Sequence, residues 1–331
     1  MQPIIRREPS PEHVTKSKAE VLESLSPLVD TLMADHLDKR KLWFPNDFLP
    51  ADEQMSDDQE AKAKALRERA RGISDGVRVS ITLNLLTEEG LPHFHRLLAM
   101  HLGDDSVWSK WNYMWTAEED RHGGILRDYV REARLFNFRQ VEMMQFAYQA
   151  AGFRPEWDKD PYKVFVYTSL QERATQTAHA NTGKHAGVWE PTLNGILASI
   201  AADEARHYAF YRKVFKALLE VDVNRALQSA VSILPSIEMP GLTVPHFKEM
   251  ADVIRRIGIY GPWDYKKLVE ELIEFWRIEV LTGLNEIGRK AQEKIMGISE
   301  RLQKVGEYLE QRTAKKSFSF EFLYGRIVVM E

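Results

Sequence analysis

The sequence of 331 residues contains no cysteine. Disulfide bonds, zinc sites built on thiolates, iron–sulfur clusters held by cysteine and a cysteine nucleophile are therefore all excluded. The absence fits a reducing compartment, where disulfides are rare. A metal site in this chain would have to rely on carboxylate and imidazole ligands.

The sequence also lacks a long apolar run and a strong net charge. No apolar segment approaches the ~20 residues that a membrane-spanning helix needs. Residues 1–13 have neither the apolar stretch of a secretory signal nor the composition of a transit peptide. The formal net charge of −4 argues against a general nucleic-acid-binding protein. We expect a cytoplasmic protein without a membrane span, in which residues 1–13 form a loose N-terminal arm.

Hydrophobic residues make up 44% of the chain and charged residues 28%, a composition typical of a globular protein with a sizeable core. Most apolar residues recur at helical spacing, which predicts an all-α protein. Because no low-complexity linker longer than ~12 residues interrupts the chain, we expect residues 1–331 to form a single domain. Residues 317–331 switch to alternating apolar side chains, which predicts a small C-terminal β-hairpin. The expected helices cover residues 18–37, 56–71, 77–101, 106–136, 138–151, 161–186, 191–220, 224–233, 246–257 and 263–289, with more helix to about 311.

One short pattern occurs twice within the expected helices. Glu119 and His122 form the first copy, in WTAEEDRHGG, and Glu204 and His207 form the second, in AADEARHYAF. Residues i and i+3 lie on the same face of an α-helix, one turn apart. Each pair can therefore direct both of its side chains at one metal ion.

A single glutamate precedes each copy at nearly the same distance. Glu88 lies 31 residues before Glu119, and Glu172 lies 32 residues before Glu204. This order of ligands is that of the ferritin-like di-iron carboxylate bundles. Two divalent cations would neutralise the four carboxylates, and a set of carboxylates and imidazoles suits iron or manganese. We therefore predict a dinuclear metal site with the ligands Glu88, Glu119, His122, Glu172, Glu204 and His207.

A surface helix often carries a glutamate and a histidine at this spacing without binding a metal. Two copies, each preceded by a glutamate and each in a largely apolar helix, favour the metal site. The remaining histidines in these helices do not follow the pattern. His93 and His95 would face apart on a helix, and His179 and His185 have no metal-ligand spacing. We interpret these four as structural or surface residues.

Six strings of sequence now identify a family. They follow the order found in the soluble acyl-[acyl carrier protein] desaturases, a group that includes the stearoyl-type Δ9 enzymes of plastids and bacterial relatives. The chain resembles this family over about residues 20–331, and the resemblance implies a ferritin-like di-iron helical bundle with additional helices, a homodimer and the same six metal ligands. Since a plastid transit peptide is missing, we expect a bacterial member. The strings are WFPNDFLP (43–50), LTEEGLP (86–92), WTAEEDRHG (115–123), YTSLQERAT (167–175), AADEARH (201–207) and LTGLNEIGRKAQ (281–292).

The resemblance implies an O2-dependent desaturase with two iron ions per chain and a ferredoxin-type electron donor. Its reaction would introduce a cis double bond into an acyl chain carried on acyl carrier protein, in fatty acid biosynthesis. Two alternatives stay open. One is a related di-iron hydroxylase or oxidase that acts on a carrier- or CoA-bound chain, and the other is a non-catalytic, ferritin-like iron-binding protein.

Three further residues take roles by their position in the family motifs. Thr175 matches a threonine on the oxygen-binding side of the metal pair, where its hydroxyl could relay a proton; the alternative is a hydroxyl bonded to its own helix. Asp203 is expected to orient a ligand histidine, His122. Trp43 matches a tryptophan that is thought to lead electrons inwards through such an Asp–His pair; the alternative is simple packing.

Positions that match the far end of the family's acyl channel hold Met100, Trp157 and Val164. Bulky side chains there should shorten the channel. We therefore expect a preference for a shorter acyl chain, or another double-bond position, than that of a stearoyl Δ9 enzyme.

Acyl carrier protein is acidic, so an enzyme with a net negative charge needs a local basic patch to attract it. The run Lys39, Arg40 and Lys41 is the first candidate. The pairs Arg6-Arg7 and Lys315-Lys316 are further candidates. The alternative for each of them is an ordinary solvated run of charges.

Overall fold

The computed structural model describes residues 16–49, 57–103, 106–157, 159–235, 240–311 and 316–330. The expected N-terminal arm at 1–13, with Arg6 and Arg7, lies outside these ranges, as does Lys315. The helices are α1 (Lys18–Ser24), α2 (Ser26–Lys39), α3 (Asp57–Ala70), α4 (Asp75–Glu88), α5 (Leu91–Leu102), α6 (Val107–Ala133), α7 (Phe138–Ala151), α8 (Pro161–Gly187), α9 (Pro191–Val221), α10 (Val223–Ile233), α11 (Phe247–Arg256), α12 (Pro262–Phe275), α13 (Glu286–Met296) and α14 (Ile298–Gln311). The 3-10 turns are η1 (Pro45–Asp47), η2 (Pro240–Thr243), η3 (Ile278–Val280) and η4 (Glu321–Leu323), and the strands are β1 (Ser317–Phe320) and β2 (Arg326–Val329). The expected all-α class is confirmed.

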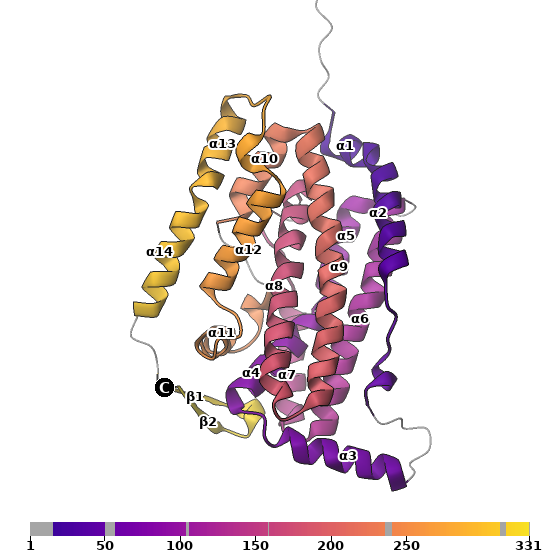
Figure 1. The fold of residues 1–331 in the computed structure, drawn as a ribbon, viewed down its shortest axis with the longest axis vertical. Coiled ribbons are helices and arrows are strands. Elements are labelled where there is room, and N and C mark those ends of the chain that lie inside the picture. Colours follow the sequence, from indigo (N-terminus) through magenta and orange to yellow (C-terminus); the bar gives the residue numbers. More distant parts are fainter. Residues whose placement is uncertain are drawn as a thin grey trace, which may run out of the picture.

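The centre of the bundle is built from α4, α6, α8 and α9 (Figure 1). Only three residues separate α8 from α9, so the two helices run antiparallel and pack along their whole length. On α9 the buried face carries Ile196, Ile200 and Tyr211, with Glu204 and His207 between them. The face that builds the core is therefore the same face that carries the polar pattern.

The other helices cover this centre. Figure 1 shows α2 on one side of the bundle, α13 and α14 on the opposite side, and α3 across one end. The helix α2 packs on α6 and α9, α12 packs on α8 and α14, and α11 packs on α4. Each outer helix is amphipathic; α11, for example, buries Met250, Val253 and Ile254. No helix in the described part of the chain has both the length and the apolar composition that would let it cross a membrane.

The prediction of a single helix over residues 77–101 is wrong, because the structure has two helices there, α4 and α5. Gly90 lies between the two helices, and Pro92 takes a position in the first turn of α5. A proline there lacks the N–H that a continuous helix would need and clashes with the preceding turn. The break leaves Glu88 as the last residue of α4.

The prediction of one long helix over residues 263–289 is also wrong. The helix α12 ends at Phe275, and α13 begins only at Glu286. Arg277 has a φ of 52° and Gly283 a φ of 73°, both in the left-handed region that a right-handed helix cannot contain. The helix expected over residues 18–37 is divided as well, since α1 and α2 meet at Leu25 and Pro27 lies in the first turn of α2.

The expected C-terminal hairpin is confirmed. The strands β1 and β2 pair antiparallel, with Phe318 opposite Val328. Phe318, Phe320 and Val328 are buried in the core cluster that also contains residues of α4, α6 and α7. The hairpin therefore closes one end of the bundle. That the whole chain forms one domain stays a prediction.

Candidate metal centre

The structure brings all six predicted metal ligands together in the core. Four helices supply them: α4 ends with the first ligand, α6 and α9 each supply a Glu-x-x-His pair, and α8 supplies one glutamate. Each of the six side chains is at least nine-tenths buried. A buried glutamate is costly unless a cation or hydrogen bonds compensate for its burial. The six are Glu88, Glu119, His122, Glu172, Glu204 and His207.

The ligands form two groups of four that overlap. Glu88 and His122 belong to one group, Glu172 and His207 belong to the other, and Glu119 and Glu204 belong to both; within each group the ligand atoms lie within 4.8 Å of one another. The two oxygens of Glu119 face different histidines, with Oε2 at 3.4 Å from Nδ1 of His122 and Oε1 at 2.8 Å from Nδ1 of His207. Glu204 is arranged in the same way, at 3.7 Å from each Nδ1. Two shared carboxylates of this kind are suited to bridging a pair of metal ions.

Several polar atoms at the centre of this cluster have no hydrogen-bond partner among the described residues. They include Nδ1 of His122, Nδ1 of His207, Oε1 of Glu119 and Oε2 of Glu204, all of them buried. The contacts between these atoms are close but lack hydrogen-bond geometry. Unpaired buried ligand atoms that converge on one place are what a metal site requires. The donor set therefore fits a pair of metal ions.

The buried carboxylates of this cluster repel one another. Burial, together with the charges of Glu119 and Glu172, raises the pKa of Glu204 well above its usual range. Burial alone would also raise the pKa of Glu88, but its attraction to His122 and its hydrogen bond with His179 outweigh burial and lower the pKa to about 2. A divalent cation on each side would remove the repulsion that Glu204 experiences.

Asp203 lies beside His122, as the sequence predicted. Nε2 of His122 is 3.2 Å from Oδ2 of Asp203, which leaves Nδ1 to face the carboxylates. The indole N–H of Trp43 donates to the same oxygen at 3.0 Å, and its ring is parallel to the His122 ring with centroids 6.0 Å apart. Arg121 and Arg206 also pair with Asp203. The three side chains Trp43, Asp203 and His122 therefore form a continuous line towards the ligand cluster.

The sequence analysis missed a matching group on the other histidine. Nε2 of His207 is 3.0 Å from Oε2 of Glu118, whose carboxylate also contacts Nε2 of His36 at 3.1 Å and Nη1 of Arg40 at 3.2 Å. Burial would raise the pKa of Glu118, but its hydrogen bonds with the two histidines hold that pKa far below its usual range. The signal was present in the sequence, because an acid directly precedes the ligand glutamate in both copies of the pattern.

His179 was also missed. It is buried, and its Nε2 is 2.7 Å from Oε1 of the ligand Glu88. The corresponding glutamate of the other group, Glu172, accepts a hydrogen bond from the indole N–H of Trp115 at 3.1 Å. His179 follows Glu172 by seven residues on α8, a spacing that resembles no ligand motif. Only the packing of α4 against α8 reveals this contact.

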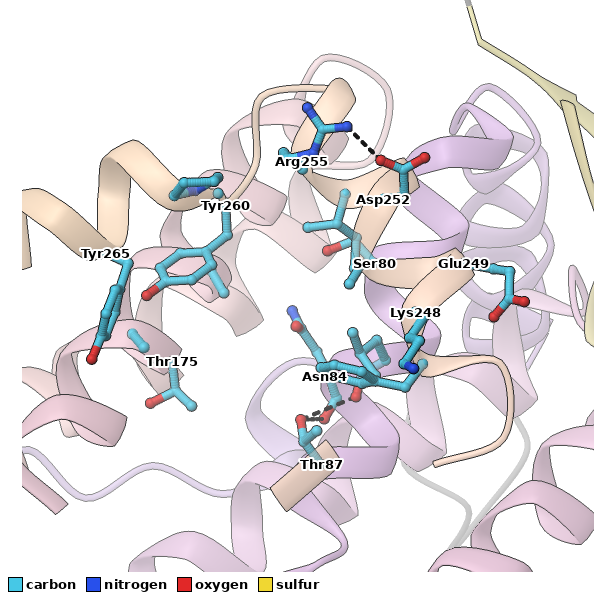
Figure 2. A pocket seen from close by; sticks show the side chains of 18 of the residues that line it. Ser80, Asn84, Thr87, Thr175, Lys248, Glu249, Asp252, Arg255, Tyr260 and Tyr265 are labelled. Atoms are coloured by element: carbon cyan, nitrogen blue, oxygen red, sulfur yellow. Dashed lines mark hydrogen bonds and ion pairs between the residues drawn. The ribbon is translucent and has the colours of Figure 1, made fainter. Parts of the chain in front are cut away.

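A cavity of about 740 Å³ lies next to the ligand cluster. It is lined from α4, α8, α11 and α12. Figure 2 shows Tyr260, Tyr265 and Thr175 at the left of the view, and Asn84 and Thr87 near its centre and lower part. Apolar lining residues include Leu83, Ala174 and Ala178. A volume of this size, with a mostly apolar wall and a few polar groups, is typical of a small-molecule site.

Thr175 faces this cavity one turn after Glu172. Its hydroxyl donates to the backbone carbonyls of Gln171 and Glu172, each at 3.1 Å. This is the bond to its own helix that the sequence analysis held as the alternative. The proposed role of Thr175 in proton transfer stays a prediction.

The three predicted channel residues do not line this cavity. Met100 is 44% exposed near the end of α5. Trp157 packs on Tyr167, with ring centroids 4.6 Å apart, and Val164 is buried in the first turn of α8. Their expected position at the far end of an acyl channel stays a prediction.

The basic run at the end of α2 divides into two kinds of residue. Lys39 and Lys41 are exposed, and Lys39 pairs with Asp35 on its own helix. Arg40 is only half-exposed, because its guanidinium reaches inwards to Glu118. The two lysines are therefore accessible to a partner, whereas Arg40 belongs to the surroundings of His207.

The fold and the site together define a class, the ferritin-like helical bundles whose core holds two overlapping groups of glutamate and histidine. Comparison with known proteins narrows this class. The fatty acid desaturase family matches residues 17–324. The chain belongs to this family.

Two relatives show the range within it. The chain is 34% identical over 328 residues to the seed-specific chloroplastic stearoyl-[acyl-carrier-protein] 9-desaturase of Brassica napus, which covers 94% of this chain and 82% of the relative. It is 32% identical over 341 residues to a chloroplastic palmitoyl-[acyl-carrier-protein] 4-desaturase of Ophrys sphegodes, covering 96% and 85%. The X-ray structure of DesA2 from Mycobacterium tuberculosis shares the fold, with a TM-score of 0.54 at 20% identity over 82% of this chain and 99% of that one.

Proposed function

We propose that this protein is an acyl-[acyl-carrier-protein] desaturase that holds two iron ions per chain. The observation that carries the proposal is the pair of overlapping ligand groups, which share Glu119 and Glu204, beside a mostly apolar cavity. Iron dependence is characteristic of this family, and its members in Brassica napus and Ophrys sphegodes are named for acyl chains on acyl carrier protein.

Bound iron would supply the redox chemistry with dioxygen. The overall reaction takes two hydrogens from adjacent methylenes of the acyl chain, two electrons from a donor, two protons and one O2, and gives a cis alkene and two waters. The side chains of this protein do the rest. They hold the metal pair, exclude bulk water and fix which methylenes lie next to it.

The cavity supports a place for the acyl chain. Ala174 and Ala178 on α8 leave space along its wall, and Thr175 lies between them at the end nearest Glu172. In the proposed reaction the hydroxyl of Thr175 would give up its hydrogen bond to the helix backbone and hold a proton at Oγ1, on the side of the cavity next to Glu172.

The line from Trp43 through Asp203 to His122 supports a route for electrons. Trp43 is 8% exposed, and its neighbours Leu42 and Phe44 are each more than half exposed. Exposed apolar side chains of this kind suit transient docking of a small electron-transfer protein. We propose a ferredoxin-type donor that docks here and reduces the metal pair through these three side chains.

The remaining assignments follow from the family and from charge. The acyl carrier protein would dock at Lys39 and Lys41, and we propose a homodimer in the cytoplasm, in a bacterial cell. Both lysines are exposed. Lys39 is the last residue of α2, which packs on both helices that carry the Glu-x-x-His pairs, and Lys41 follows two residues later.

The test is product analysis with defined substrates. Iron-loaded protein, reduced ferredoxin, O2 and palmitoyl- or stearoyl-carrier protein should give a monounsaturated acyl chain, identified by mass spectrometry, with about two irons per chain. A hydroxylated product would favour the related hydroxylase. Binding of many irons per chain, with no O2 consumption that depends on substrate, would favour an iron-storage protein.

A further inference from the structure

The two ligand groups differ in what holds their unshared glutamate. Glu172 accepts from the indole of Trp115, while Glu88 accepts from Nε2 of His179 at 2.7 Å. The single nitrogen of an indole always carries its hydrogen and can only donate. A neutral imidazole, in contrast, can carry its hydrogen on either nitrogen. The hydrogen bond to Glu88 therefore depends on what the other nitrogen of His179 contacts.

That other nitrogen faces an amide. Nδ1 of His179 lies 3.3 Å from Nδ2 of Asn84, one turn before Glu88 on α4. The amide nitrogen of an asparagine can only donate, so it selects an unprotonated Nδ1. The hydrogen of His179 then lies on Nε2, where it points at Glu88.

The orientation of the Asn84 amide is itself determined. Its nitrogen also donates to Oγ1 of Thr182 at 3.4 Å. Thr182 uses its own hydrogen for the carbonyl of Ala178 at 2.7 Å, so its oxygen must accept from Asn84 and from Ser80, which is 2.8 Å away. Every hydrogen in this network then has one acceptor: Asn84 donates one hydrogen to Thr182 and the other to His179, and His179 donates its own to Glu88.

The residues of this hydrogen-bond network also separate Glu88 from the cavity. Ser80, Asn84 and His179 all line the cavity, whereas Glu88 does not. Figure 2 shows Asn84 pointing into this space from α4. Because Asn84 fixes the tautomer of His179, His179 can keep its hydrogen bond to Glu88 whether or not a molecule occupies the cavity.

We propose that His179 is a positioning residue for Glu88, kept in the Nε2–H form by Asn84, and that it sets the metal affinity of the Glu88–His122 half of the centre. The inference rests on the proposed dinuclear centre. Loss of a partner that orients a metal ligand typically weakens metal binding about 10- to 100-fold. The effect should fall on one of the two metal ions, because Glu172 is held separately by Trp115.

The experiment titrates metal-free protein with Co2+ and follows its visible absorption and calorimetric heat. Wild-type protein should bind two Co2+. H179F should weaken one of the two sites about 10- to 100-fold and leave the other unchanged, and N84L should weaken the same site by a smaller factor. H179Q, whose amide can still donate to Glu88, should restore most of the affinity. W115F should weaken the opposite site.

The matched control is H185A, since His185 lies on the same helix and is exposed; it should bind Co2+ as the wild type does. Circular dichroism and the melting temperature confirm that each variant is folded. If the wild type binds two Co2+ and H179F binds them equally well, the inference about His179 is overturned and the proposed metal centre still stands. The same holds if H179Q binds as poorly as H179F. Failure of the wild type to bind two Co2+ would overturn the proposed centre itself.

Discussion

Asp203 on α9 lies 3.2 Å from Nε2 of His122 on α6. A second acid–histidine pair joins the same two helices, with its acid on α6 and its histidine on α9. Glu118 on α6 lies 3.0 Å from Nε2 of His207 on α9. Each acid directly precedes a ligand glutamate of its own helix, and each orients the ligand histidine of the other helix. Neither Glu-x-x-His pair is therefore complete without the helix that carries the second one.

Replacement of Trp43 by phenylalanine should slow reduction of the metal pair by ferredoxin. The variant keeps an aromatic ring but loses the N–H that donates to Asp203 at 3.0 Å. We expect the rate of reduction in stopped-flow measurements to fall about tenfold, since Asp203 loses a donor and the residues around a metal ligand typically affect activity by about 10- to 100-fold. Single turnovers started from chemically reduced protein should be unchanged. W189F, at an exposed position, serves as the control; equal rates for W43F and the wild type would exclude the route.

Replacement of Glu204 by glutamine should have opposite effects on the metal-free and metal-loaded proteins. Because burial and two neighbouring carboxylates raise the pKa of Glu204, removing its charge should raise the melting temperature of the metal-free protein. Iron or Co2+ at about 100 times its Kd should raise the wild-type melting temperature by roughly 5 °C or more. E204Q should lose most of that increase. Scanning calorimetry with and without a chelator checks both effects, and a metal-free E204Q that melts below the wild type contradicts the first.

Metal binding should strengthen as the pH rises from 6 to 8. Burial alone would lower the pKa values of His122 and His207, but hydrogen bonds and charges from surrounding carboxylates raise both well above 6.5. In the metal-free protein these protons stabilise the fold below pH ~6.5, and that stabilisation is lost as the pH rises through the raised pKa values. A metal ion must displace them, so the apparent affinity should increase about tenfold per pH unit for each proton released. Co2+ titrations that show the same Kd at both ends of this range would contradict the prediction.

The chain-length preference tests the predicted channel end. If Met100, Trp157 and Val164 close the channel, the wild type should prefer a chain shorter than stearoyl. W157A should then shift the preference towards stearoyl-carrier protein, because the side chain on Tyr167 is removed. Product profiles with myristoyl, palmitoyl and stearoyl substrates measure this. A wild type that is best with stearoyl and forms only the Δ9 product would refute the assignment.

Charge reversal at Lys39 and Lys41 should weaken docking of the carrier protein. K39E/K41E should raise KM for the carrier-bound substrate several-fold at low salt and much less at high salt, while kcat stays unchanged. Arg40 is left intact because it contacts Glu118. The control is K290E, an exposed lysine on α13. A KM that matches the wild type at low salt would remove these lysines from the interface.

The clustering of the proposed ligands was predictable because its signal is local. Glu119 and His122 lie within one turn of one helix, and so do Glu204 and His207, so the spacing alone places them on a common face. The residues around them were harder to find. His36 approaches Glu118 from 82 positions away, and His179 approaches Glu88 from 91 positions away. No spacing rule connects residues that meet only when helices pack.

The helix boundaries failed for a different reason. Gly90 and Pro92 were visible in the sequence, but the apolar period continues across them from α4 into α5. The period therefore indicated one helix where the backbone requires two. The opposite holds for the end of α12, where no proline or glycine marks the turn at Arg277. This residue has a left-handed backbone directly after the buried Trp276.

The break after α4 has a consequence for how this protein can change. Glu119, Glu172 and Glu204 lie within helices that continue for several turns beyond them, so any lengthening or rotation there displaces a ligand. Glu88 is followed almost at once by a new helix with its own direction. A change in the length of α5 therefore need not lengthen or rotate α4 and displace Glu88. The break lets α5 be reshaped while the last residue of α4 keeps its place among the proposed ligands.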